Sequence, residues 1–245
     1  MKLDAKSTIE TGKAILGIEL GSTRIKAVLI DQENKPIAQG SHTWENQLVD
    51  GLWTYSIEAI WSGLQDCYAD LRSNIKNLYG DVEIENLAAI GVSAMMHGYM
   101  PFNEKEEILV PFRTWRNTNT GRAAAALSEL FVYNIPLRWS ISHLYQAILD
   151  NEAHVKDIKF LTTLAGYVHW QITGEKVLGI GDASGMLPID SVTDNYSAEM
   201  VAKFDNLVAP KEYGWKLEDI LPKVLSAGEN AGVLTPEGSK KLDVS

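Results

Sequence analysis

At residues 17–26 the sequence reads Gly-Ile-Glu-Leu-Gly-Ser-Thr-Arg-Ile-Lys, which places a polar turn between two β-rich runs. These runs cover residues 14–20 and 25–30, and a third begins at Ile37 after another polar turn. Short β-rich runs joined by turns that contain glycine or asparagine are typical of neighbouring antiparallel strands. The stretch therefore predicts a three-stranded antiparallel meander at the start of the fold.

A helix and a further strand follow the meander. Apolar residues recur at three- and four-residue steps from Ile57 to Leu78, which predicts one amphipathic helix packed on the sheet. The run from Leu87 to Ser93 is almost continuously apolar, which favours a central parallel strand covered on both faces. The resulting order, β-β-β-α-β, indicates an α/β domain with a mixed central sheet flanked by helices.

The rest of the chain predicts mostly helices. Runs at residues 99–102 and 108–112 bracket a charged turn and indicate a hairpin, and residues 179–185 read as a glycine-rich loop. Helical patterns cover residues 121–131, 142–149, 160–172, 198–204 and 237–242. Residues 1–13 mix charges with single apolar residues and are interpreted as a short, mobile lead-in. We expect residues 14–245 to form one domain.

Composition argues against several classes of protein. The 245 residues include 22 Lys and Arg against 32 Asp and Glu, and a net charge of −10 opposes binding to nucleic acid or to anionic membranes. No apolar run approaches the length of about 20 residues that spans a bilayer, and residues 1–13 lack the apolar stretch of a signal peptide. The single cysteine, Cys67, rules out an intramolecular disulfide, and the five histidines lack zinc-site spacing. These features predict a cytoplasmic globular protein.

The turn at Gly21, Ser22 and Thr23 has the composition of an anion site. Glycine permits a positive φ and close backbone approach, and successive backbone N–H groups and hydroxyls offer converging donors. Glu19 ends the preceding strand, where a carboxylate can hold Mg²⁺ directly or through water. A strand follows the turn, which excludes a Walker A loop, since that loop needs a helix there. A tight hairpin without any ligand explains the same residues, and the local pattern alone favours that interpretation.

Three later segments carry side chains suited to a polar ligand. Residues 93–98 include His97 at the end of a predicted parallel strand, the edge where α/β sheets usually bind ligands. Residues 112–119 surround Trp115 with guanidinium and amide groups, which suits the apolar face and the hydroxyls of a sugar. A later turn offers the carboxylate of Asp182. Each also has a plainer interpretation: a histidine bonded to a carbonyl, a core tryptophan with surface neighbours, and a stabilised turn.

Taken in order, these segments resemble the FGGY family of carbohydrate kinases, and more closely its xylulokinase-like branch. Residues 17–26 resemble the family's first phosphate motif, G-I-D-x-G-T, and residues 96–98 match its M-H-G. Residues 115–117 resemble its W-N-D segment, and residues 182–185 match its D-A-S-G loop. Four matches in the family's order are far more specific than any one of them. The resemblance covers nearly all of residues 14–242.

The resemblance implies an actin-like, ribonuclease H-like domain that takes part in the ATP- and Mg²⁺-dependent phosphorylation of a sugar or polyol hydroxyl. It assigns the phosphates to Gly21, Ser22, Thr23 and Arg24, and the metal to Glu19. The residues that it places at the sugar are Met96, His97, Trp115, Arg116, Asn117 and Asp182. Such kinases hold sugar mostly in the first of two domains and nucleotide mostly in the second. A small-molecule sugar and a C-terminal kinase domain are therefore the expected partners.

Departures from the family pattern refine these expectations. Glu19 stands where the family has Asp, so its carboxylate lies one methylene further out. Asn117 stands where xylulokinases have Asp, and Arg116 replaces Asn, so the sugar preference is expected to differ. The catalytic base, an Asp in a G-D-x-x-G-like stretch, and the nucleotide domain are expected beyond Ser245. No catalytic residue is therefore assigned in this chain.

The leading hypothesis is the N-terminal half of a sugar kinase that is inactive on its own. A freestanding sugar-binding or regulatory module without catalysis would carry the same motifs. An actin-like domain used for assembly would share the fold but bind no sugar. An apolar face left without its second domain predicts self-association, so a homo-oligomer is also expected.

Overall fold

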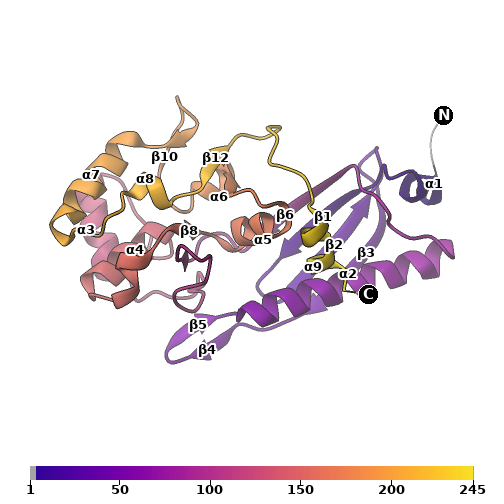
Figure 1. Ribbon diagram of the computed structural model, residues 1–245, viewed down its shortest axis with the longest axis horizontal. Coiled ribbons are helices and arrows are strands. Elements are labelled where there is room, and N and C mark those ends of the chain that lie inside the picture. Colours follow the sequence, from indigo (N-terminus) through magenta and orange to yellow (C-terminus); the bar gives the residue numbers. More distant parts are fainter. Residues whose placement is uncertain (1–3, 245) are drawn as a thin grey trace. The chain divides into compact units, whose positions relative to one another are not determined.

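The computed structural model describes residues 4–244, which divide into two compact units. The sheet unit comprises residues 4–46, 56–95 and 234–244, and the helical unit comprises residues 47–55 and 96–233. Figure 1 traces the chain as it passes repeatedly from one unit to the other. Each unit has buried apolar side chains of its own.

The sheet unit is built on four strands in the order β3-β2-β1-β6. Strands β1 (Ile15–Leu20), β2 (Arg24–Ile30) and β3 (Pro36–Thr43) pair antiparallel, and β6 (Ala89–Ala94) pairs parallel to β1. The predicted meander and the predicted β-β-β-α-β order are confirmed. The sheet is mixed because a parallel pair needs a long crossover, and the helix between β3 and β6 supplies it.

Helix α2 (Ile57–Tyr79) packs on this sheet, as predicted for residues 57–78. It begins where the hydroxyl of Ser56 accepts a backbone hydrogen bond, and it ends at Gly80, whose φ is +77°. A Cβ at Gly40 on β3 would lie 2.3 Å from the carbonyl oxygen of Cys67 on the helix. Only glycine therefore allows the helix to approach β3 this closely.

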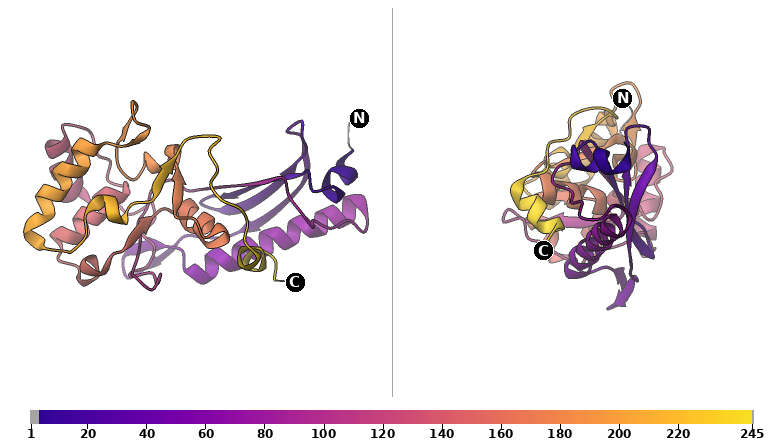
Figure 2. Two further views of the ribbon diagram at one scale, coloured as in Figure 1. Left: turned by 45° about the horizontal axis from the view of Figure 1, so that its top comes forward. Right: turned by 90° about the vertical axis from the view of Figure 1, so that its right-hand side faces the viewer.

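Helix α9 (Pro236–Leu242) lies beside α2 in both views (Figures 1 and 2). The side chain of Gln65 donates to the carbonyl oxygen of Lys241 at 3.0 Å. Arg72 and Asp243 form an ion pair at 2.9 Å, one residue past the end of the helix. The helix predicted for residues 237–242 is thus confirmed and closes the sheet unit over α2.

Strand β6 corrects the prediction for residues 87–93. It runs parallel to β1, as expected, but among residues 4–244 it is the edge strand of the sheet rather than a central one. Its side chains are alternately exposed and half-buried, so neither face is fully covered. Hydrophobicity alone does not report the order of strands in a sheet, which is why the prediction fails here.

The segment before β1 differs from the mobile lead-in that the sequence indicates. Its described part forms helix α1 (Ala5–Glu10), in which Thr8 and Ile9 are buried. The carboxylate of Asp4 caps the helix by accepting a hydrogen bond from the backbone N–H of Ser7 at 2.7 Å. Residues 1–3 of that interpretation lie outside the described residues.

The helical unit contains most of the helices and several short strand pairs. Its helices and 3₁₀ turns are α3 (Gly121–Phe131), α4 (Ser140–Leu149), η1 (Ala153–Asp157), α5 (Leu164–Thr173), α6 (Ile180–Ala183), α7 (Ala198–Val208), η2 (Ala209–Lys211) and α8 (Leu217–Ile220). Its strands are β4 (Gln47–Val49), β5 (Leu52–Thr54), β7 (Met100–Phe102), β8 (Phe160–Thr162), β9 (Val177–Gly179), β10 (Ile189–Asp190), β11 (Asn195–Tyr196) and β12 (Lys223–Leu225). Among residues 4–244, no helix is both long and apolar enough to cross a membrane.

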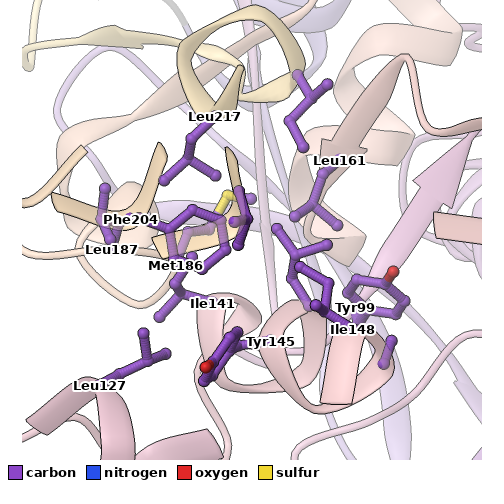
Figure 3. Close-up of a cluster of buried hydrophobic side chains, with 14 of the residues drawn as sticks. Tyr99, Leu127, Ile141, Tyr145, Ile148, Leu161, Met186, Leu187, Phe204 and Leu217 are labelled. Carbon is purple, nitrogen blue, oxygen red and sulfur yellow. The ribbon is translucent and has the colours of Figure 1, made fainter. Parts of the chain in front are cut away.

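A single cluster of buried side chains forms the core of the helical unit. Figure 3 shows part of it, with Tyr99, Ile148 and Phe204 among the labelled residues. Helices α3 and α4 contribute Leu127 and Ile141 to the same cluster. The predicted helices at residues 121–131, 142–149 and 198–204 are confirmed, because their apolar stripes are the faces buried here.

Three predictions for this unit need correction. The hairpin predicted for residues 99–102 and 108–112 forms through two antiparallel bridges, Tyr99 with Arg113 and Phe102 with Ile108, but residues 108–112 form no continuous strand. The continuous partner of β7 is β8. The predicted helix at 160–172 begins as β8, and helix α5 starts only after Thr163. The predicted loop at 179–185 contains the short helix α6. For residues 160–172, the pairing of β8 with β7 and the cap at Thr163 override a pattern that periodicity alone cannot resolve.

Candidate functional site

The turn between β1 and β2 is held mainly by backbone contacts in the sheet unit. Gly21 N–H donates to the carbonyl oxygen of Arg24 at 3.0 Å, and a Cβ at Gly21 would lie 3.0 Å from the same oxygen. The indole N–H of the buried Trp44 donates to the carbonyl oxygen of Gly21 at 2.7 Å. Gly21 does not have a positive φ, which corrects the reason given for this glycine. It is required by close packing within the turn rather than by a left-handed backbone.

Side chains at this turn face outward. Ser22, Thr23 and Arg24 are exposed, so their polar groups lie at the surface beside the backbone of the turn. The sequence prediction that this turn meets phosphates is compatible with that exposure. It stays a prediction, because the same geometry is that of a tight hairpin.

Glu19 lies on the open face of the sheet, one residue before the end of β1. Its neighbours across the strands are Lys26 on β2 and Ser93 on β6. The Glu19 carboxylate lies 3.6 Å from the ammonium of Lys26, and its side chain is 57% exposed. Among residues 4–244, no cluster of three metal-binding side chains is present. Glu19 is thus a single exposed carboxylate beside Lys26, and its binding of Mg²⁺ stays a prediction.

The loop at residues 96–98 has a strained backbone in the helical unit. His97 has φ +73° and Gly98 has φ +106°, two consecutive left-handed residues. For histidine this conformation is uncommon and persists only where the surroundings hold it. Met96 beside it is 38% exposed. The strain lies at the residue that the sequence analysis placed at the sugar.

The imidazole of His97 is held neutral and oriented. Its Nδ1 lies 3.3 Å from the carbonyl oxygen of Gly185, and since that oxygen can only accept, Nδ1 carries the proton. Nε2 is then the acceptor. Burial lowers the pKa of His97, and the positive charge of the Arg138 guanidinium lowers it further. The hydrogen bond to the carbonyl oxygen of Gly185 raises the pKa, but the net shift is downward. The ring therefore offers an acceptor rather than a positive charge near neutral pH.

The loop at residues 182–185 packs directly against His97. A Cβ at Gly185 would lie 2.5 Å from His97 Nδ1, so this position admits only glycine. Asp182, in the short helix α6, accepts a hydrogen bond from the hydroxyl of Thr163. Burial raises the pKa of Asp182, and the bond from Thr163 acts in the opposite direction. The structure thus brings two of the predicted sugar-binding segments together.

The first turn of α4 joins both segments. The hydroxyl of Ser140 donates to the carbonyl oxygen of Gly98 at 2.5 Å. Its backbone N–H donates to the carbonyl oxygen of Gly185 at 3.4 Å, the same atom that His97 contacts. Neither Ser140 nor Thr163 is identified by the sequence analysis, because a serine or threonine at a helix start is explained equally well as a cap.

Residues 115–117 lie against β5 rather than around an open pocket. Asn117 is buried, and its side chain binds both backbone groups of Trp53, accepting from N–H at 2.9 Å and donating to the carbonyl at 2.8 Å. The guanidinium of Arg116 lies 3.6 Å from the centre of the Trp53 ring. Trp115 is 36% exposed. Of these three predicted sugar residues, Asn117 is largely used in holding the hairpin of β4 and β5, while Trp115 keeps an exposed surface.

The predicted residues therefore form two groups, one in each unit. Glu19 and residues 21–24 lie in the sheet unit, and the loops around His97, Trp115 and Asp182 lie in the helical unit. Binding of phosphate or sugar by either group stays a prediction.

The comparisons with known proteins place this geometry in a family. The model for the FGGY family of carbohydrate kinases, N-terminal domain, matches residues 14–244. The chain belongs to the FGGY family of carbohydrate kinases. Its mixed sheet flanked by helices is accordingly the actin-like, ribonuclease H-like fold, and the resemblance seen in the sequence motifs is confirmed.

Individual relatives are distant and longer. Xylulose kinase from Klebsiella pneumoniae is 21% identical over 91% of this chain, which covers 44% of that protein. A crystal structure of a xyloylose kinase from Brucella ovis superposes with a TM-score of 0.76 at 21% identity, over 91% of this chain and 46% of the other. Plasmodium falciparum glycerol kinase, solved with ADP, gives a TM-score of 0.72 at 15% identity, over 94% of this chain and 46% of the other. This FGGY chain thus spans less than half the length of each of these three relatives.

Proposed function

We propose that this chain is the sugar-binding part of an ATP-dependent kinase that transfers the γ-phosphoryl group to a hydroxyl of a pentose, ketose or related sugar. The observation that carries the proposal is the strained, neutral His97, packed on the loop that contains Asp182. A backbone held in an unfavourable conformation beside an oriented acceptor is more typical of a binding site than of a structural loop.

The helical unit supplies groups that match a sugar. His97 Nε2 accepts a hydrogen bond from one sugar hydroxyl, and the carboxyl of Asp182 binds another. The exposed face of Trp115 packs on the C–H face of the ring. Met96 and Arg116 flank these groups, and Asn117 acts mainly by holding Trp53 in place.

The sheet unit supplies groups that match phosphate and metal. Backbone N–H groups of residues 22–24, with the hydroxyls of Ser22 and Thr23 and the guanidinium of Arg24, approach the phosphate oxygens beside Gly21, whose own N–H donates to Arg24. Glu19 holds Mg²⁺ through one carboxylate oxygen or through water. The metal, when bound, neutralises charge on the phosphates, which is the main requirement of phosphoryl transfer.

We also propose that turnover needs groups beyond these two sites. Asp182 is bonded to Thr163 and belongs to the sugar loop, so we assign the catalytic base and most of the nucleotide site to the remaining length of a full kinase. The 245-residue chain alone is then expected to phosphorylate nothing. We further propose that the protein works in the cytoplasm, where ATP is available.

A thermal-shift and calorimetric screen tests the sugar proposal. Pentoses including D-xylulose, hexoses, polyols including glycerol, and D-gluconate are titrated into the wild-type chain, and at least one is expected to raise the melting temperature. His97→Ala is expected to abolish that shift, while His42→Ala, which alters a histidine of the sheet unit, is expected to keep it. Absence of any shift with pentoses, hexoses and polyols would refute the proposal and favour an assembly role.

A kinase assay tests the role of the remaining length. The 245-residue chain with ATP, Mg²⁺ and D-xylulose is expected to form no sugar phosphate, whereas a version that continues through a G-D-x-x-G segment and a second domain is expected to be active. Phosphorylation by the short chain alone would show that it already contains a base. Sugar binding with no activity in the longer version would favour a non-catalytic binding module.

A further inference from the structure

A group of polar side chains, buried except for the 29% exposed Glu152, lies next to the candidate sugar loops, and none of the sequence motifs includes it as a unit. We call it the Arg113 cluster: Tyr99, Arg113, His143, Glu152 and His154. Arg113 is 6% exposed, and its guanidinium forms two hydrogen bonds to the carboxylate of Glu152, one of them 2.9 Å long. This is a two-point contact between planar groups, which fixes orientation as well as distance.

The other members surround this ion pair. The Arg113 guanidinium lies 5.2 Å from the centre of the Tyr99 ring, and the Tyr99 hydroxyl lies 2.8 Å from His154 Nε2. His154 Nδ1 in turn lies 3.5 Å from the Glu152 carboxylate. The ring centre of His143 lies 6.3 Å from that of Tyr99.

Two members of the cluster lie next to the loops that contain His97 and Trp115. Arg113 and Tyr99 exchange two backbone hydrogen bonds, at 3.0 and 3.2 Å. Tyr99 follows His97 by two residues, and Arg113 precedes Trp115 by two. The two loops therefore diverge from one short backbone pair, and Glu152 ties that pair to the segment that follows α4.

Stability alone does not account for this arrangement. Burying the Arg113 guanidinium costs desolvation, and apolar residues of similar volume often give stability equal to or greater than that of such a pair. The cluster also leaves buried atoms without partners: both ring nitrogens of His143 and Nε of Arg113. A group selected only for stability would satisfy or remove these atoms. The Arg113–Glu152 pair instead fixes the position of the His97 loop relative to the Trp115 loop.

We propose that Arg113 and Glu152 are a positioning pair for the sugar site. They set the spacing between the loop of His97 and the loop of Trp115, and so raise affinity for the sugar without touching it. The expected effect of the pair on sugar affinity rests on the proposed function. Its expected effect on the geometry of the two loops does not. Rigid placement of ligand-contacting groups increases affinity because less order has to be imposed on binding.

The test replaces both charges at once. The double variant Arg113→Met and Glu152→Met removes the pair without leaving a buried charge, so the melting temperature is expected to stay close to that of wild type. The matched control is Arg122→Met with Asp150→Met, an ion pair in the same unit whose side chains are 67% and 41% exposed. Arg113→Lys keeps the charge but loses the two-point contact, and serves as a conservative variant that retains the fold.

Two readouts separate positioning from a structural role. The first is the Kd for D-xylulose by calorimetry, expected to rise about tenfold or more in the double Met variant and less in Arg113→Lys. The second needs no sugar: the ¹⁹F signal of 5-fluorotryptophan at Trp115, assigned with Trp115→Phe, and the ring signals of His97. Both are expected to shift or broaden in the double Met variant and to stay unchanged in the control.

Each outcome decides the question. Unchanged Trp115 and His97 signals in a folded double variant would overturn the inference, as would unchanged affinity. The wild-type chain could also fail to bind D-xylulose while the Trp115 and His97 signals change in the double Met variant. That result would refute the proposed function for D-xylulose and support the effect of the pair on the two loops. If the double Met variant fails to fold, the same two readouts on Arg113→Lys decide, with wild-type signals and affinity counting against positioning.

Discussion

The turn at residues 21–24 and the loop at residues 96–98 are stabilised in different ways. The turn is held through its backbone, by the bond from Gly21 to Arg24 and by the indole of Trp44, while its side chains face outward. The loop is held through side chains: His97 on Gly185, and Ser140 on Gly98. Backbone donors suit phosphate, which any N–H can bind, whereas a sugar needs particular side chains at particular places. The difference predicts that mutations are tolerated in the turn and costly around the loop.

The largest effect on stability is expected from Gly185→Ala, because Gly185 packs against His97 in the loop at residues 96–98. Its new Cβ would lie 2.5 Å from His97 Nδ1, so the imidazole or the loop has to move. We expect the free energy of unfolding to fall by about 1–3 kcal/mol, as in other overpacked sites. Urea unfolding measures this, and calorimetry with D-xylulose is expected to show loss of binding. Gly181→Ala is the control, because no heavy atom lies within 4 Å of its added Cβ.

Acid is expected to destabilise the helical unit. Burial lowers the pKa of His143 to about 3, against 6.5 in the unfolded chain. Between these values the unfolded chain binds more protons than the folded one, so stability falls as pH falls below 6.5. At pH 5 the loss from His143 alone is about 2 kcal/mol. Burial lowers the pKa values of His97 and His154 as well, and their contributions have the same sign.

Urea unfolding at pH 7 and pH 5 measures this effect, and His143→Gln provides the comparison. The amide does not titrate, so the variant is expected to lose less stability than wild type between the two pH values. An equal loss in both proteins would show that His143 is not the group responsible.

A smaller effect is expected from Trp44→Phe at the turn. The variant keeps an aromatic ring but loses the indole N–H that donates to the Gly21 carbonyl at 2.7 Å. We expect the free energy of unfolding to fall by about 1 kcal/mol, the usual net value of one such bond. Hydrogen exchange of the amides at residues 21–24 is expected to quicken in parallel. Unchanged exchange would mean that the turn is held by its own backbone bond alone.

The smallest effect is expected from Glu19→Gln. The Glu19 carboxylate is largely exposed and lies 3.6 Å from Lys26, so removing its charge is expected to change stability by less than about 0.5 kcal/mol. Chemical denaturation measures this directly. A loss above about 1 kcal/mol would show that contacts between side chains on the sheet, rather than backbone hydrogen bonds, hold the turn at residues 21–24.

The sequence predicted local secondary structure better than it predicted which distant residues contact one another. Helices α2 and α3 were predicted within one residue of their ends, because their apolar spacing and the flanking Ser56 and Gly80 act locally. Asn117 was placed at the sugar from a motif, yet its amide binds the backbone of Trp53, which is 64 residues away. Contacts of that kind depend on tertiary packing, which periodicity does not encode.

The candidate site shows the same limit. His97 and Asp182 were found because ordered motifs mark them. Arg113 lies in the candidate segment at residues 112–119, but its partner Glu152, 39 residues away, belongs to no motif. An arginine after an apolar run is usually at the surface, and here it is 6% exposed. The signal that was available is the position itself: a charged residue two places before a tryptophan assigned to the sugar.

The edge strand β6 has a consequence for how the protein behaves when concentrated. The strand reads Ala-Ile-Gly-Val-Ser-Ala, with no charge and no proline, and along one side no strand among residues 4–244 pairs with it. Charged residues and proline are what usually prevent such an edge from recruiting further chains. As long as that edge stays open it is a template for cross-β assembly, so thioflavin-positive fibrils are expected on storage at high concentration. A lysine at Val92 or Gly91 is the simplest protection.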